Sequence, residues 1–180
     1  MRITKENTVA LIVDMQERLF PVMFENHRLA KNCGILIEGL IELNVGTVFT
    51  QQYTKGLGET LPEIKALISD FSFTEKQTFS CYEEPKLKEK LEGINAKNII
   101  ICGIESHVCV LQTAVDLKEA GLNPIVIMDC VSSRNKENIE LAKERFRLER
   151  IMMSSYESIL FELTRSAKSP EFKSISKLVK

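Results

Sequence analysis

The stretch "IICGIESHVCVLQTAVDLKEAG", residues 100–121, decides the fold class and raises the first functional question. It starts as an apolar run typical of a buried strand, turns sharply near Gly103 and continues at helical spacing to Gly121. Cys109 falls close to the predicted helix start. It is therefore either a packed core thiol or a nucleophile at the mouth of a site.

The same order of strand and helix repeats along the whole chain. Apolar runs such as "TVALIVD" (8–14) do not alternate with polar residues, so they predict strands that are covered on both faces. The alternation predicts a single three-layer α/β/α domain over residues 1–180, with a mainly parallel, Rossmann-like sheet of about six strands. The expected strands are 8–14, 46–52, 71–76, 97–103, 124–133 and 150–155, and the expected helices are 28–44, 60–69, 84–94, 106–121, 135–149 and 156–165.

Length, charge and cysteine content disfavour several classes of protein. The 180 residues suffice for one core, and a net charge of -1 gives no reason to expect nucleic acid or an anionic membrane as a partner. No apolar run approaches the roughly 18 residues of a membrane span, and the N-terminal residues lack the apolar core of a signal peptide. The five cysteines are odd in number and form no CxxC pair, so we expect reduced thiols in a cytoplasmic protein.

Cys109 lies where the start of a helix would activate a thiol. Ser106 is expected to cap the helix through its hydroxyl, which places Cys109 in the first turn. There the free N–H groups and the positive end of the helix dipole lower the pKa of a thiol. The same N–H groups would form an oxyanion hole beside the sulfur. The alternative is that Cys109 is one more small apolar residue of a buried helix face.

Two further residues are expected at the same edge of the sheet. Asp14 ends the strand 8–14 and Lys76 ends the strand 71–76, and ligands of parallel sheets bind beyond the carboxyl ends of the strands. In that position Asp14 would accept the thiol proton, Lys76 would hold charge near both groups, and Cys109 would attack a carbonyl. Taken singly, Asp14 is also interpretable as a turn or capping residue and Lys76 as a solvated surface lysine.

Four motifs carry a family resemblance over essentially the whole chain. They are "ALIVDMQERLF" (10–20), "TQQYTKGLG" (50–58), "EKQTFSC" (75–81) and "GIESHVCVLQTAVDLKEAG" (103–121). With these motifs the chain resembles the isochorismatase-like cysteine hydrolases. The resemblance implies a catalytic triad of Asp14, Lys76 and Cys109. It also implies a non-proline cis peptide bond between Ile104 and Glu105, which would aim backbone N–H groups, including that of Cys109, at a developing oxyanion.

The implied activity is that of a cysteine hydrolase acting on a small amide-like, ester-like or vinyl-ether-like substrate. The nicotinamidase branch carries an Asp-x-His metal pair after its second strand, whereas this chain has "TQQYTKGLGET" (50–60) there. Its only histidines are His27 and His107, which we expect to be structural or solvent-facing. The resemblance therefore predicts a metal-free enzyme without a cofactor, outside the nicotinamidase branch.

The resemblance also suggests which residues surround the substrate. Gln52 and Tyr53 are expected at the pocket mouth, with Gln16, Phe20 and Phe79 as further candidate walls, although core packing is an equal expectation for Phe79. Family members usually form dimers or larger assemblies. We therefore expect a small-molecule substrate and a homo-oligomer, and neither nucleic acid nor membrane as a partner. The identity of the substrate does not follow from the sequence.

Two other functions stay open beside hydrolysis. A catalytically silent scaffold of the isochorismatase fold would bind a partner protein, but it would have no chemical reason to retain all three triad residues. A thiol redox sensor would need a resolving cysteine. The expectation for Cys33, Cys102 and Cys130 is a place in the core. Cys81 follows Lys76 closely, so a place near the site is open to it, but packing is the favoured interpretation.

Overall fold

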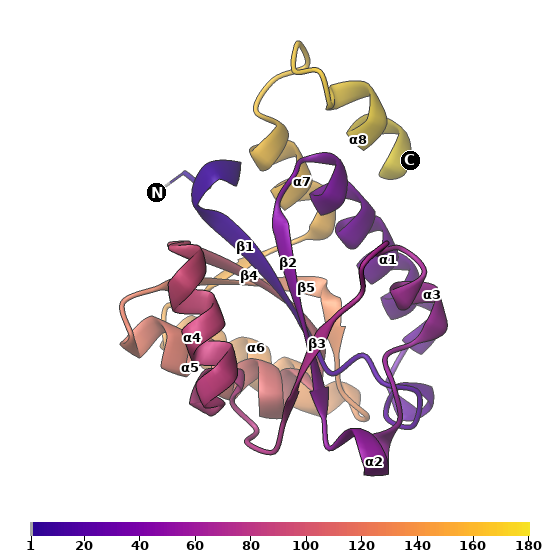
Figure 1. The fold of residues 1–180 in the computed structure, drawn as a ribbon, viewed down its shortest axis with the longest axis vertical. Helices are drawn as coiled ribbons and strands as arrows, with labels where there is room; N and C mark the ends of the chain where they lie inside the picture. Colours follow the sequence, from indigo (N-terminus) through magenta and orange to yellow (C-terminus); the bar gives the residue numbers. More distant parts are fainter. Residues whose placement is uncertain (1) are drawn as a thin grey trace.

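Six parallel strands form one sheet in the order β3-β2-β1-β4-β5-β6, as the computed structural model of residues 2–180 shows (Figure 1). This confirms the predicted fold class, a mainly parallel sheet of about six strands between helical layers. The strands are β1 (Thr8–Val13), β2 (Gly46–Gln52), β3 (Phe73–Lys76), β4 (Asn98–Ile104), β5 (Asn123–Ser132) and β6 (Met152–Ser154).

Helices cover both faces of the sheet (Figure 1). One face carries α1, α3, α7 and α8, and the other carries α4, α5 and α6. The bounds are α1 (Asn26–Glu42), α2 (Thr54–Leu57), α3 (Pro62–Lys65), α4 (Pro85–Ile94), α5 (Leu111–Glu119), α6 (Lys136–Leu148), α7 (Tyr156–Thr164) and α8 (Phe172–Leu178). Among residues 2–180, no helix is both long and apolar enough to cross a membrane.

The central strand β1 shows why the strands of this sheet are apolar at consecutive positions. Ala10 and Ile12 pack into the buried cluster on the α1 side, whereas Val9, Leu11 and Val13 pack into the cluster on the α4 side. Successive side chains of a strand point to opposite faces, and here both faces are covered. The strand therefore needs apolar residues at every position rather than at every second one.

The strand order reverses at the centre of the sheet. From β1 the chain adds β2 and β3 on one side, and it then returns to add β4, β5 and β6 on the other side. In open parallel sheets, ligands bind beyond the carboxyl ends of the strands at such a reversal. Asp14 directly follows β1, Lys76 ends β3, and Cys109 follows β4. The fold therefore brings all three residues to this edge.

Some elements differ from the sequence-based expectation. The expected helix 60–69 is helical only over Pro62–Lys65, because the chain then tightens into turns, with the N–H groups of Leu67 and Ile68 bonded to the carbonyls of Ile64 and Lys65. The expected helix 106–121 begins as a π-helical turn over Ser106–Val110, and α5 follows it. The short helices α2 and α8 were not predicted.

Gly103 of β4 lies very close to the backbone of β1, near the carboxyl ends of both strands. Its φ is 114°, and a Cβ atom there would lie 2.0 Å from the carbonyl oxygen of Val13. We expect Gly103→Ala to lower the free energy of unfolding by about 2–5 kcal/mol, because the backbone conformation and the contact both exclude a side chain. Urea unfolding followed by circular dichroism measures this change.

Gly34→Ala is the matched control. Gly34 lies inside α1, and nothing stands within 4 Å of the added Cβ. The control should raise the free energy of unfolding by about 0.5–1 kcal/mol, as alanine does in helix interiors. A Gly103→Ala protein that unfolds at the wild-type urea concentration would refute the predicted close approach.

Candidate active site

The carboxylate of Asp14 is fixed at the end of β1 by two neighbours. Asp14 adopts a left-handed backbone conformation with φ of 49°, and its side chain is fully buried. The Thr50 hydroxyl donates a hydrogen bond to Oδ1 at 2.7 Å and accepts one from the Asp14 N–H at 3.3 Å. The Nζ of Lys76 lies 2.8 Å from Oδ2. One oxygen is therefore held by a hydroxyl of β2, and the other faces the lysine.

Lys76 reaches this carboxylate from β3, across the end of β2. Its Nζ donates to Gln52 Oε1 at 2.5 Å and to the carbonyl oxygens of Thr78 and Phe79 at 3.1 and 3.2 Å. Burial is the largest single effect and acts against the charge of Lys76, but the charge and hydrogen bond of Asp14, together with the nearby Cys81 and Cys109, raise the pKa of Lys76 above its usual value. Lys76 is therefore a buried ammonium group and not the solvated lysine of the alternative interpretation.

The Sγ atom of Cys109 completes the cluster, 3.6 Å from Lys76 Nζ. Only 7% of Cys109 is exposed. Burial and the negative charge of Asp14 raise the pKa of the thiol to about 12, although the charge of Lys76 acts in the opposite direction. The structure thus brings the three predicted residues together and corrects the expectation of a lowered thiol pKa. In the resting site the thiol is protonated beside an Asp14–Lys76 ion pair.

The turn before the thiol also differs from the expectation. Ser106 does not cap the helix, because its buried Oγ has no hydrogen-bond partner among residues 2–180. The carbonyl of Glu105 instead accepts hydrogen bonds from the N–H groups of Val108 and Val110 at 3.1 and 3.2 Å.

The peptide bond between Ile104 and Glu105 is cis, at the position that the resemblance implies. The Glu105 carboxylate binds the backbone N–H and Nε of Arg134 at 3.0 and 3.2 Å.

Gln16 was expected to line the pocket, but it has a structural role. It is fully buried, and its Nε2 donates to the carbonyl oxygens of Gln52 and Gly58 at 3.0 and 2.7 Å. Its Oε1 accepts the N–H of Gln52 at 2.7 Å. The Gln16 amide therefore ties the end of β2 to the loop after α2. Phe20 is likewise buried in the core cluster on the α1 side and presents no free wall.

The other three candidate pocket residues surround Lys76. Tyr53 donates its N–H to the Lys76 carbonyl at 3.1 Å, and Phe79 accepts from Lys76 Nζ through its own carbonyl. Their side chains are 48% and 56% exposed, which excludes core packing for Phe79. Gln52 accepts from Lys76 and donates from Nε2 to the Gln77 carbonyl at 2.9 Å. Of these three side chains, the Gln52 amide contacts the ammonium group, whereas Tyr53 and Phe79 contact Lys76 through backbone atoms and expose their rings.

Sequence reasoning missed one residue of the site, Thr50, and it favoured core packing for Cys81 over a place near the site. Both are buried, and their Oγ1 and Sγ atoms lie 4.0 Å apart. A signal for Thr50 was present, because it is the first polar residue after the apolar pair Val48 and Phe49, at a position near the carboxyl end of β2. Cys33, Cys102 and Cys130 are fully buried in the cluster on the α1 side of the sheet, which confirms their assignment to the core.

The histidines do not gather at this edge as metal ligands would. His107 Nδ1 lies 2.9 Å from Ser133 Oγ, and His27 lies in the first turn of α1. Within the described part of the chain, no three His, Cys, Asp or Glu side chains converge as a metal site requires. The chemistry available at the edge is that of a thiol, a carboxylate and an ammonium group.

Fold and site together define a parallel α/β protein with a thiol and a buried Asp–Lys pair at the point where the strand order reverses. Residues 8–157 match the isochorismatase domain model, and the chain belongs to that family. This confirms the resemblance seen in the sequence. The isochorismatase domain-containing protein 2 of Danio rerio is 34% identical over 179 residues, which cover 99% of this chain and 89% of that protein.

Two solved structures show the same fold. The Mar1 ribonuclease from Caenorhabditis elegans has a TM-score of 0.93 and 32% identity, with 99% of this chain and 92% of that chain covered. YcaC from Escherichia coli, described as an octameric hydrolase of unknown specificity, has a TM-score of 0.93 and 21% identity, with 99% and 89% covered. The likeness to YcaC is a likeness of fold.

Asp14→Asn tests which charge keeps the thiol protonated. The substitution removes the negative charge and leaves the ammonium group of Lys76 beside the sulfur, so the pKa of Cys109 should fall from about 12. Iodoacetamide labelling of Cys109, followed across pH by peptide mass spectrometry, should set in at lower pH in the variant than in the wild type.

Asp116→Asn is the control for this experiment. Asp116 lies on α5, the helix that follows Cys109, and its replacement changes the net charge by the same amount. Its labelling profile should match that of the wild type. An unchanged or higher labelling midpoint in Asp14→Asn would contradict the assigned role of the carboxylate.

Proposed function

We propose that the chain is a metal-free cysteine hydrolase that acts on a small amide-like, ester-like or vinyl-ether-like substrate. One observation carries the proposal: the Nζ of Lys76 lies 2.8 Å from Asp14 Oδ2 and 3.6 Å from Cys109 Sγ. A single buried ammonium group thus faces both the base and the nucleophile. Such a site supports nucleophilic catalysis by a thiol that an adjacent base deprotonates.

The first step is a proton transfer within the buried cluster. Asp14 takes the thiol proton, so the negative charge moves from the carboxylate to the sulfur of Cys109. The total charge of the cluster does not change, and Lys76 is close to the negative charge before and after the transfer. The cost of burying a new, unpaired charge is thereby avoided. The thiolate exists as the product of this transfer, although the pKa of the thiol is high.

With an amide-like or ester-like substrate, the thiolate then attacks the carbonyl group. A bond forms between Sγ and the carbonyl carbon, and the carbonyl oxygen takes up the negative charge, which backbone N–H groups near Cys109 stabilise. The leaving group receives the proton from Asp14 as its bond to carbon breaks. Asp14 then activates water, which attacks the thioester and releases the acid and the thiol.

The surroundings of the thiol favour a small substrate. The low exposure of Cys109 admits a small carbonyl group to the sulfur, and Tyr53 and Phe79, whose backbones contact Lys76, expose rings that are candidate apolar walls. The five unpaired thiols suit a reducing compartment, so we place the protein in the cytoplasm. By analogy with the octameric YcaC, we extend the proposal to a homo-oligomer.

An activated ester tests the chemistry without knowledge of the natural substrate. With p-nitrophenyl acetate we expect a burst of nitrophenol and an acetyl group on Cys109, detected by peptide mass spectrometry. Cys109→Ser, which keeps the shape of the side chain, should lose the burst. A panel of small primary amides, with release of the carboxylic acid as readout, then defines the substrate class. A burst that survives in Cys109→Ser, or an acetyl group on another residue, would refute the nucleophile and favour a silent scaffold.

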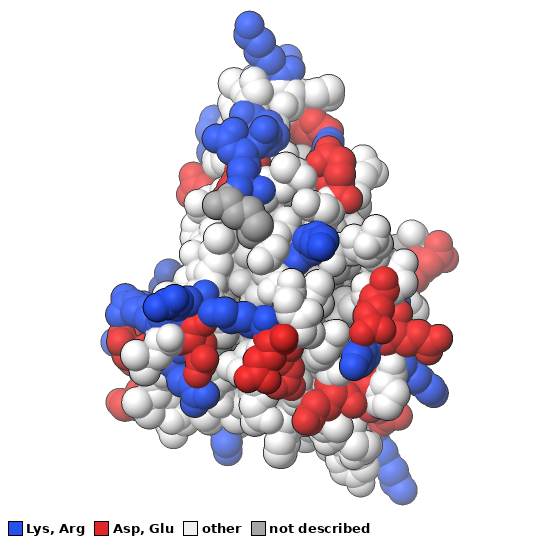
Figure 2. Space-filling model, turned by 90° about the vertical axis from the view of Figure 1, so that its left-hand side faces the viewer, with Lys and Arg blue, Asp and Glu red and all other residues white. Residues whose placement is uncertain are grey.

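RNA belongs in the same panel, because the Caenorhabditis elegans relative is described as a ribonuclease. Figure 2 shows one face of the molecule, on which Lys and Arg side chains gather in a short band at the left, with Asp and Glu side chains below it and at the right. The acidic groups leave no basic surface across this whole face for a phosphate backbone. We therefore expect no cleavage of an RNA oligonucleotide. Cleavage that depends on Cys109 would show that RNA, and not only a small molecule, is a substrate of the site.

Thr50→Val tests how the base is oriented. The valine keeps the branched shape but removes the hydroxyl that donates to Asp14 Oδ1 at 2.7 Å. Loss of a hydrogen bond to a charged group should slow acylation by roughly 10- to 100-fold, with a smaller change in KM. Thr50→Ser retains the hydroxyl and should restore most of the rate. Equal rates for the two variants would contradict the positioning role of Thr50.

A further inference from the structure

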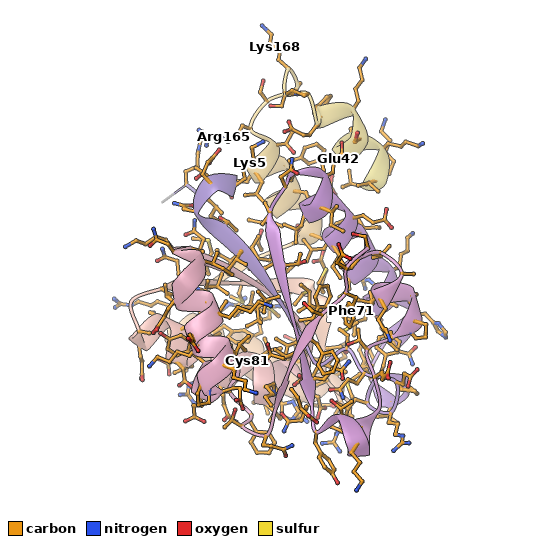
Figure 3. All side chains as sticks on the ribbon, in the orientation of Figure 1. Lys5, Glu42, Phe71, Cys81, Arg165 and Lys168 are labelled. Carbon is orange, nitrogen blue, oxygen red and sulfur yellow. The ribbon has the colours of Figure 1, made fainter. Side chains whose placement is uncertain are left out.

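Cys81 is a second thiol at the site, and the proposed hydrolysis does not use it. It begins a short 3-10 turn, Cys81–Glu83, that follows β3 and Lys76. The residue is labelled in Figure 3 and lies on the α4 side of the sheet. Its Sγ lies 4.0 Å from the Oγ1 of Thr50, the same hydroxyl that binds Asp14. Cys81 therefore lies fully buried beside a hydroxyl that binds the catalytic carboxylate.

The backbone of Cys81 is anchored to the helix that follows Cys109. The N–H of Cys81 donates to Thr113 Oγ1 at 2.8 Å. Thr113 is four residues after Cys109, so the two residues lie one above the other on the same helix face. Both cysteines also belong to one buried cluster. The anchor thus holds Cys81 beside the turn that presents the nucleophile.

The same ion pair acts on both thiols. The charges of Asp14 and Lys76 act on the pKa of Cys81 as they act on that of Cys109, and Cys81 in turn acts on the pKa of Cys109. Burial is the largest cause that raises the pKa of Cys81, again to about 12. The three remaining cysteines lie in the other cluster, on the α1 side of the sheet. Cys81 is therefore the thiol that shares a site with Cys109.

We propose that Cys81 is a resolving thiol, and that a small hydroperoxide such as hydrogen peroxide converts Cys109 and Cys81 into a disulfide. The inference relies on the reactive Cys109 of the proposed function and goes beyond it, because it adds a modification that needs no hydrolysable substrate. It also reverses the expectation from the sequence that no resolving cysteine is available.

The chemistry proceeds in two balanced steps. Asp14 takes the proton of Cys109, the thiolate attacks one oxygen of the peroxide, the O–O bond breaks, and the departing oxygen takes the proton from Asp14 and leaves as water. Cys109 is now a sulfenic acid. The sulfur of Cys81 then attacks the sulfur of Cys109, the S–O bond breaks, and the hydroxyl leaves with the Cys81 proton as a second water. Two thiols are oxidised and one peroxide is reduced.

The exposure of the two sulfurs sets the order of these steps. Cys109 is 7% exposed and Cys81 is 0% exposed, so a small oxidant reaches Cys109 first. Cys81 then attacks from the protein side, where water and further peroxide are excluded. A sulfenic acid without such a partner is oxidised further to sulfinic acid, which thiol reductants do not restore. The disulfide would thus keep the nucleophile recoverable while the enzyme is inactive.

The test treats native protein with hydrogen peroxide at neutral pH and analyses peptides without reduction. In the wild type we expect a peptide pair linked through Cys81 and Cys109, lighter by two hydrogen atoms than the separate thiols. Dithiothreitol should remove the link and restore labelling of Cys109 by iodoacetamide. In Cys81→Ala the linked pair should be absent, and Cys109 should progress to the sulfinic acid, which dithiothreitol does not reverse.

Two further variants keep the outcome decisive. Cys81→Ser repeats the test with a polar replacement in case the alanine variant folds poorly, and Cys33→Ala removes a buried thiol of the other cluster and should still form the link. A wild type that forms sulfinic acid at Cys109 as readily as Cys81→Ala, or a link to another cysteine, would overturn the proposal. If p-nitrophenyl acetate acylates Cys109 but no link forms, only this inference fails. If neither reagent modifies Cys109, the proposed hydrolase fails as well.

Discussion

The buried ion pair of Asp14 and Lys76 is the interaction on which the rest of the site depends. Neither side chain contacts solvent, and Nζ lies 2.8 Å from Oδ2. Removing one partner of such a pair leaves an uncompensated buried charge, at a cost of about 3–5 kcal/mol. The ends of β1, β2 and β3 meet around the pair, and Thr50 and Gln52 of β2 each satisfy one of the two charged groups. The pair therefore fixes the geometry of three strand ends at once.

The same ion pair also affects whether the thiol of Cys109 is protonated. A thiol at a helix start is expected to ionise easily, and this expectation considered only the helix that carries Cys109. In the structure, burial raises the pKa of the thiol, and so does the negative charge of Asp14, a residue from a different part of the sequence. A protonated thiol beside an ionised base is a stable resting state. Reaction then needs a proton transfer over a short distance rather than a permanently ionised sulfur.

The sequence predicted the parts of this molecule that depend on local pattern. Continuous apolar runs such as Val9–Val13 identified buried strands, and their alternation with helices identified the parallel sheet and its functional edge. Gln16 and Phe20, which were expected to line the pocket, are buried, because a residue after a strand end can face the core or the site, and spacing does not distinguish these directions. Contacts between segments, such as Thr50 with Asp14 or Cys81 with Thr113, leave no periodic signal.

Burial of the site restricts the size of the substrate, and it also gives a reason for a second thiol at the site. An ion pair attracts strongly only where water is excluded, so the strand ends must close over Asp14 and Lys76. This closure leaves Cys109 with little exposure, and it buries Cys81 completely in the same cluster. A site closed to this extent selects small electrophiles of any kind, whether a carbonyl compound or a peroxide. Selection by size alone does not distinguish a carbonyl compound from a peroxide, so a peroxide can oxidise Cys109. A neighbouring thiol that allows the oxidised Cys109 to be reduced again therefore has a chemical reason to lie beside this ion pair.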